Sequence, residues 1–121
     1  MDVNDCADAV QALSSPSRGL IDSSRVFISG GSGGGYTALQ SLCTVDSAVY
    51  TGGTSSFGFS NLCTLAEDAS KFGLNYMDKL LGGPVTHVAH VYRARSPIFH
   101  AENIEVPLLV RFPVPLLAIL R

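Results

Sequence analysis

The residues most able to do chemistry form a Gly30-x-Ser32-x-Gly34 pattern, which follows an apolar run at 26–28 and precedes a helical pattern. A serine in a tight turn from strand to helix projects its hydroxyl above the sheet, where it can attack an acyl carbon. We expect side chains at Gly30 and Gly34 to collide with the neighbouring strand and helix. The backbone amide of Gly33 would then donate a hydrogen bond to the developing oxyanion.

Two other kinds of glycine-rich site are alternatives to this interpretation. A phosphate-binding P-loop requires a lysine where Tyr36 stands, so that alternative fails. A dinucleotide-binding loop matches in letters at Gly33, Gly35 and Ala38, but it begins four residues after Ser29. The next expected strand also lacks the acidic residue that such sites use, and the dinucleotide hypothesis stays as a minor alternative.

The elements that must position this serine alternate between helical and extended patterns along the chain. We expect a helix through Val3, Cys6, Val10 and Leu13, strands at 26–28, 48–51 and 107–112, and helices at 36–43, from Asn61 to Ala66, at 76–81 and at 87–95. This order predicts an α/β fold with a parallel sheet. The run at 26–28 does not alternate between polar and apolar residues, which is typical of a strand buried on both faces.

Composition excludes several classes of protein. Among the 121 residues, 46% are hydrophobic and 15% are charged, and the net charge is −2. This balance excludes intrinsic disorder, and the absence of a basic surplus argues against nucleic acid as a partner. The uncharged stretches 26–45 and 47–66 are rich in glycine and serine, so we expect no membrane span. The low charge content is typical of the interior of a larger domain.

The three cysteines suggest neither a disulfide scaffold nor a zinc site. Cys6, Cys43 and Cys63 are odd in number and form no C-x-x-C pair. The N-terminus is acidic and has no hydrophobic signal region. We therefore expect a reducing compartment, the cytoplasm, and no metal or organic cofactor.

Several separated blocks in the same order resemble the prolyl oligopeptidase family of serine peptidases, in particular its acylaminoacyl-peptidase and dipeptidyl-peptidase-like branch. The blocks are Asp2-Val3-x-Asp5-Cys6, Gly19-Leu20-Ile21-Asp22-x-x-Arg25, the stretch from Ile28 to Leu39, Phe57-Gly58, Asp68, Lys71-Phe72, Tyr76, Tyr92-x-x-Arg95-Ser96-Pro97-Ile98-x-His100-Ala101 and Ile104-x-Val106-Pro107-Leu108-Leu109. The resemblance implies an incomplete α/β-hydrolase domain over residues 1–110, with a mostly parallel sheet and flanking helices. Residues 111–121 would form a divergent tail.

The same resemblance implies serine-type hydrolysis of peptide bonds through an acyl-enzyme at Ser32, with the Gly33 amide as one oxyanion donor. The second donor is expected upstream of Met1. The implied partners are a peptide substrate, the remainder of the hydrolase domain and a β-propeller domain. A general esterase of the same fold, or a non-catalytic product that binds by strand addition, are the alternatives.

The triad acid and base are not at the positions where the resemblance places them. No acidic residue follows Glu105 and no histidine follows His100, although both should come after the strand that begins at Pro107. The possible substitutes are Asp46, Glu67, Asp68 and Asp78 as acid and His87, His90 and His100 as base. We expect Glu67 and Asp68 on a solvated helix end, and the 121-residue chain alone to have little or no peptidase activity.

Overall fold

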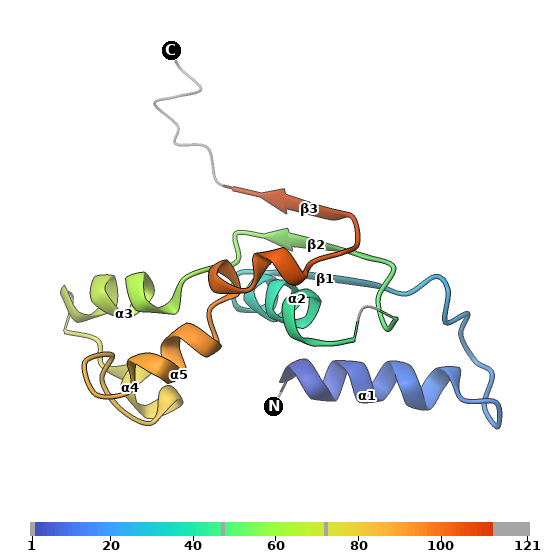
Figure 1. The fold of residues 1–121 in the computed structure, drawn as a ribbon, viewed down its shortest axis with the longest axis horizontal. Coiled ribbons are helices and arrows are strands. Elements are labelled where there is room, and N and C mark those ends of the chain that lie inside the picture. Colours follow the sequence, from blue (N-terminus) through green and yellow to red (C-terminus); the bar gives the residue numbers. More distant parts are fainter. Residues whose placement is uncertain (1, 47, 72, 113–121) are drawn as a thin grey trace, which may run out of the picture.

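A computed structural model describes residues 2–46, 48–71 and 73–112. Its elements run in the order α1 (Asp2–Ser14), β1 (Phe27–Gly31), α2 (Gly33–Thr44), β2 (Gly52–Ser56), α3 (Leu62–Lys71), α4 (Tyr76–Leu81), α5 (Ala89–Ala94), two short 3₁₀ turns, η1 (Pro97–Phe99) and η2 (Ala101–Asn103), and β3 (Leu108–Arg111). The strands form one parallel sheet in the order β1-β2-β3. In Figure 1 the helices lie on one side of this sheet.

The sequence prediction of the second strand was wrong. The strand occupies Gly52–Ser56 rather than 48–51. Tertiary packing explains the shift. A Cβ atom at Gly53 would lie 2.8 Å from the Leu42 side chain, and one at Gly52 would lie 3.2 Å from the Phe27 ring. Small residues are therefore needed where β2 passes between its neighbours, and this need overrides weak strand propensity.

Most of the helix predictions are confirmed, with small differences at the ends. Asn61 caps α3 as expected, because its Oδ1 accepts hydrogen bonds from the amides of Cys63 and Thr64. Helix α2 begins three residues earlier than the expected 36–43. Helix α5 begins at Ala89 rather than at the expected residue 87, so His87 precedes the helix.

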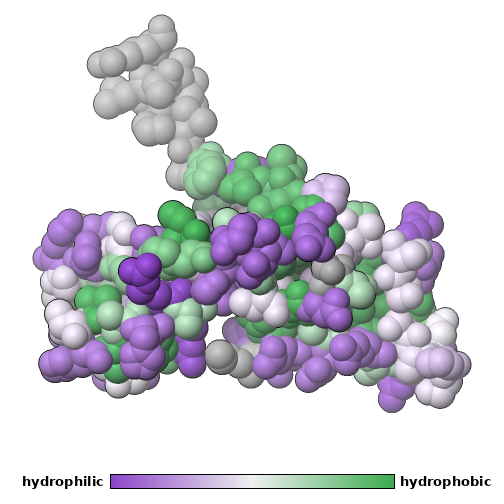
Figure 2. All heavy atoms as spheres, viewed as in Figure 1, coloured by the Kyte–Doolittle hydropathy of each residue, from purple (hydrophilic) through white to green (hydrophobic). Residues whose placement is uncertain are grey.

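One face of the sheet carries α2, and among the described residues no helix covers the other face, which we call the bare face. Register places Ile28, Gly53 and Leu108 on the α2 face, and Ser29, Thr54 and Leu109 on the opposite face. On that opposite face Phe27 is 68% exposed and Leu109 is 53% exposed. In Figure 2, hydrophobic atoms gather along the upper border of the view, over β3. The expectation that the first strand is buried on both faces was therefore wrong for this chain.

The helices α3, α4 and α5 share a small core centred on one tyrosine. Tyr92 is 0% exposed and packs with Leu62, Met77 and Leu81. Its hydroxyl donates to the carbonyl oxygen of Gly83 at 3.1 Å. Burial, and secondly the nearby Asp78 carboxylate, raises the pKa of the Tyr92 phenol, which therefore stays protonated and able to donate. This core fixes α4 and α5 beside the start of α3.

Candidate active site

The strand β1 and the helix α2 are joined by a single residue, Ser32. Its backbone lies at φ 53° and ψ −116°, a region that residues with side chains rarely adopt. Two backbone hydrogen bonds hold it there: the Ser32 amide donates to the Ser56 carbonyl at 2.8 Å, and the Tyr36 amide donates to the Ser32 carbonyl at 3.1 Å. The Ser32 side chain is exposed and makes no capping hydrogen bond to α2. Its hydroxyl is thus presented to solvent from a strained turn.

Gly30 and Gly34, the two glycines of the motif, differ in the space available for a side chain. A Cβ atom at Gly30 would lie 2.2 Å from the Gly34 carbonyl oxygen, so the expected steric need for glycine is found there. A Cβ atom at Gly34 would have nothing within 4 Å, so the collision expected at that position was wrong. The tight position is the next one, Gly35, where a Cβ atom would lie 2.8 Å from the Cα of Gly58.

The first turn of α2 begins at the residue that follows Ser32. The helix begins at Gly33, so the Gly33 and Gly34 amides belong to the group that has no partner within a helix. Such amides attract a negatively charged oxygen. The same boundary removes the dinucleotide alternative, because Gly33 and Gly35 lie inside the helix and leave no glycine loop between strand and helix.

The strained backbone at Ser32 predicts how a glycine at this position would change the stability of the chain. We expect Ser32→Gly to stabilise the chain by about 1 kcal/mol, because glycine adopts this backbone conformation at little cost. Chemical denaturation of the variant and the unmodified chain measures the difference. A control is Ser29→Gly in β1, where glycine should instead destabilise by about 0.5–1 kcal/mol. A Ser32→Gly variant that is less stable than the unmodified chain would contradict a strained turn.

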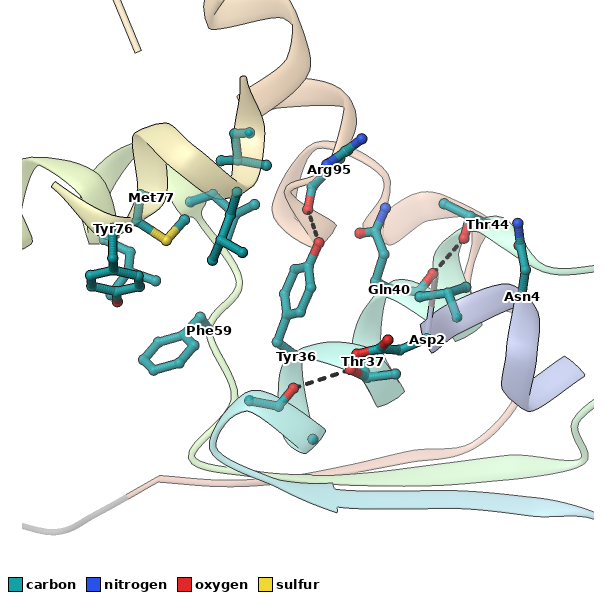
Figure 3. Close-up of a pocket in the computed structure, with 17 residues that line it drawn as sticks. Asp2, Asn4, Tyr36, Thr37, Gln40, Thr44, Phe59, Tyr76, Met77 and Arg95 are labelled. Atoms are coloured by element: carbon teal, nitrogen blue, oxygen red, sulfur yellow. Dashed lines mark hydrogen bonds between the residues drawn. The ribbon is translucent and has the colours of Figure 1, made fainter. Parts of the chain in front are cut away.

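A cavity of about 670 Å³ begins beside this turn, with Gly33 and Gly34 in its wall. Figure 3 shows Phe59, Tyr76 and Met77 on one side of it, and Gln40, Thr44 and the start of α1 on the other. Tyr36 stands between the two sides, and its hydroxyl donates to the Arg95 carbonyl at 2.8 Å. Burial raises the pKa of the Tyr36 phenol, so this hydrogen bond persists well into the alkaline range. The cavity is mostly apolar on the side of α3 and α4, as ligand pockets commonly are.

Phe57 is a site residue to which the sequence assigned no role. It follows the last residue of β2, and register puts that end of β2 beside the end of β1 that precedes Ser32. Its φ of 58° is unfavourable for a bulky residue, and its ring is half exposed. The Phe57 amide donates to the Arg111 carbonyl at 2.8 Å, which holds the turn. Nothing in the local sequence signals this conformation.

The candidate acids have other partners in the structure. Asp46 accepts a hydrogen bond from the Ala48 amide, and Asp68 pairs with Lys71 on the solvent-exposed side of α3. Glu67 is also exposed, which confirms the expected solvated position of this pair. Asp78 lies 3.4 Å from the Tyr92 hydroxyl. Within the described ranges, no hydrogen bond joins any of these carboxylates to the Ser32 hydroxyl.

The candidate bases are placed no closer to the serine. His87 and His90 are exposed on either side of the start of α5. His100 lies between η1 and η2, which contact Cys43 at the far end of α2. That end is about 15 Å along the helix axis from Gly33. As far as the structure describes the chain, the serine turn is therefore formed without a triad around it.

The described residues show no site for thiol chemistry or for a metal ion. All three cysteines are free thiols, and burial followed by the Glu102 carboxylate raises the pKa of Cys43, which disfavours a reactive thiolate. No group of three or more metal-binding side chains occurs in the described ranges. No described helix is long and apolar enough to cross a membrane.

Comparison with known proteins decides the family. The sequence matches the prolyl oligopeptidase family over residues 1–114. The chain belongs to the prolyl oligopeptidase family. It is similar to the structure of a puromycin-hydrolysing peptidase of Mycobacterium tuberculosis, with 38% identity and a TM-score of 0.79 over 90% of this chain. No curated protein matches it significantly.

Two further solved structures are similar to the chain in fold. The acylaminoacyl peptidase of Pyrococcus horikoshii is 29% identical over 89% of this chain, with a TM-score of 0.72. Dipeptidyl peptidase 4 of Porphyromonas gingivalis shares the fold, with a TM-score of 0.68 at 20% identity over 90% of this chain. The chain spans only 16%, 17% and 14% of these three proteins, in the order given. The three-stranded sheet with its helices is thus an incomplete α/β-hydrolase arrangement.

Proposed function

We propose that this chain is the part of a serine peptidase that carries the nucleophile, Ser32. The observation that supports this most directly is the strained, exposed serine between β1 and α2, next to helix amides that have no partner within the helix. Membership of the prolyl oligopeptidase family points to the same role. The proposed partners are a peptide substrate and the remainder of the hydrolase domain, and the proposed compartment is the reducing cytoplasm.

The proposed reaction forms an acyl-enzyme. The Ser32 oxygen bonds to the carbonyl carbon of the peptide while a general base takes the hydroxyl proton. The carbonyl oxygen becomes an oxyanion, to which the Gly33 amide donates a hydrogen bond. The carbon–nitrogen bond then breaks, the amine leaves with a proton, and water hydrolyses the serine ester. The apolar side of the cavity, near Phe59 and Met77, suggests that an apolar substrate side chain lies there.

The 121-residue chain on its own should carry out only part of this sequence. The described residues bring neither a histidine nor a carboxylate to the Ser32 hydroxyl, so the proton transfer lacks its base. We therefore expect slow labelling of Ser32 by a fluorophosphonate probe and little or no turnover of a chromogenic dipeptide ester. A general base contributes about 10²–10⁴-fold to the rate of such reactions. We expect the reaction at Ser32 to be slower by a factor of that size than in a peptidase with a complete triad.

The experiment compares the unmodified chain with Ser32→Ala. Mass spectrometry should find the phosphonate on the peptide that contains Ser32, and the Ser32→Ala variant should carry none. The matched control is Ser60→Ala, which removes another exposed serine hydroxyl, in the segment before α3, and should leave labelling unchanged. A folded chain that is not labelled at Ser32 would rule out an activated serine and favour a binding role. Ester turnover that depends on Ser32 would show instead that a base is present.

A further inference from the structure

The first turn of α2 contains three consecutive glycines, Gly33, Gly34 and Gly35. Glycine loses more conformational freedom on folding than any other residue and is the weakest helix former after proline. The Ser32 side chain does not cap this turn. A turn of this composition needs an external contact if its amides are to keep one direction.

Ser55 in β2 supplies a polar contact to this turn. Its side chain is 0% exposed, and its hydroxyl donates to the Gly35 carbonyl oxygen at 3.0 Å. Register pairs Ser55 with Gly30, on the face of the sheet that carries α2. The hydroxyl therefore lies between the sheet and the turn that begins immediately after Ser32.

The surroundings of this hydroxyl leave little freedom. A Cβ atom at Gly35 would lie 3.0 Å from the Ser55 oxygen, and a Cβ atom at Gly58 would lie 2.4 Å from it. A buried hydroxyl is unfavourable unless it is hydrogen-bonded. The Gly35 carbonyl is the partner that the structure gives it, and the contact therefore ties β2 to the glycine turn.

We propose that Ser55 is a positioning residue for the reaction at Ser32, because its hydroxyl fixes the direction in which the Gly33 and Gly34 amides point. The inference rests on the proposed function and adds to it a residue that does not touch the substrate. An oxyanion site depends on donors that are already aimed before the charge develops. Loss of the Ser55 hydroxyl should therefore reduce the reactivity of Ser32 more than it reduces the stability of the fold.

The test compares Ser55→Ala with Ser29→Ala, a serine in β1 on the opposite face of the sheet. By NMR, the Gly35 carbonyl ¹³C resonance should move upfield in Ser55→Ala, and the Tyr36 amide should exchange with solvent about fivefold faster. Amides of α3 should be unaffected. At a temperature where both variants are folded, fluorophosphonate labelling of Ser32 should be about fivefold slower in Ser55→Ala. Ser29→Ala should match the unmodified chain in every readout.

The two readouts separate the two proposals. If the unmodified chain is not labelled at all, the proposed function fails, and the exchange and carbonyl measurements decide alone whether Ser55 holds the turn. If the Tyr36 exchange rate and the Gly35 carbonyl resonance do not differ between Ser55→Ala and Ser29→Ala, the inference is overturned. Faster exchange with unchanged labelling of a reactive chain also overturns it, because the role would then be structural. Should Ser55→Ala fail to fold, Ser55→Cys, which keeps a weak donor, should give intermediate exchange and labelling.

Discussion

Gly30→Ala is expected to destabilise the chain by about 3 kcal/mol. The new methyl group would lie 2.2 Å from the Gly34 carbonyl oxygen, which belongs to the backbone and cannot rotate away. Relief requires β1 and the first turn of α2 to separate, which would also disturb the hydrogen bond from the Ser32 amide to the Ser56 carbonyl. Denaturant unfolding followed by circular dichroism measures the loss.

The matched control for this prediction is Gly34→Ala. A Cβ atom there has open space, and the position lies in the first turn of a helix, so alanine should be neutral or stabilise by up to about 1 kcal/mol. The two variants make the same chemical change in the same motif, yet only Gly30→Ala should lose stability. Equal losses of stability in both variants would refute the steric explanation.

Tyr92→Ala is expected to cost about 3–5 kcal/mol, the range seen for truncation of a fully buried aromatic side chain. The side chain is 0% exposed and packs with Leu62 and Met77, and its hydroxyl donates to the Gly83 carbonyl. A cost of this size approaches the whole stability of many small domains. Thermal and denaturant unfolding of purified variants would measure it.

Tyr92→Phe separates packing from hydrogen bonding at this position. It keeps the ring and removes only the hydroxyl, so we expect a loss of about 1 kcal/mol. Because Tyr92 itself does not line the cavity beside the serine turn, this variant should not alter phosphonate labelling of Ser32. A loss in Tyr92→Phe as large as in Tyr92→Ala would show that the hydroxyl, rather than the ring, holds the core.

The sequence indicated the helices better than the sheet. Helix α4 was predicted at its observed bounds, and the cap at Asn61 was identified from one residue type. The position of β2 could not be found in this way, because Gly52 and Gly53 have low strand propensity and are selected by the packing of Phe27 and Leu42. Residues 113–121, most of the expected tail, lie outside the described residues, while Arg111 belongs to β3.

Within the candidate site, the sequence located the serine turn but not its supports. The Gly30-x-Ser32-x-Gly34 spacing placed the turn correctly between strand and helix. The steric role of Gly35 and the buried hydroxyl of Ser55 depend on contacts with β2 and its following loop, which lie about 20 residues further along the chain. Such contacts leave no local pattern, because any small residue would satisfy the spacing.

The bare face of the sheet affects the expected abundance of the chain in a cell. Phe27 and Leu109 stay in contact with water in the folded state, on strands that also form the two edges of the sheet. Chaperones and quality-control proteases recognise exposed apolar segments as a sign of incomplete folding. The bare face keeps apolar side chains exposed even when the chain is folded. The abundance of the chain would therefore depend more on how quickly another protein surface packs on the bare face than on the free energy of unfolding of the chain.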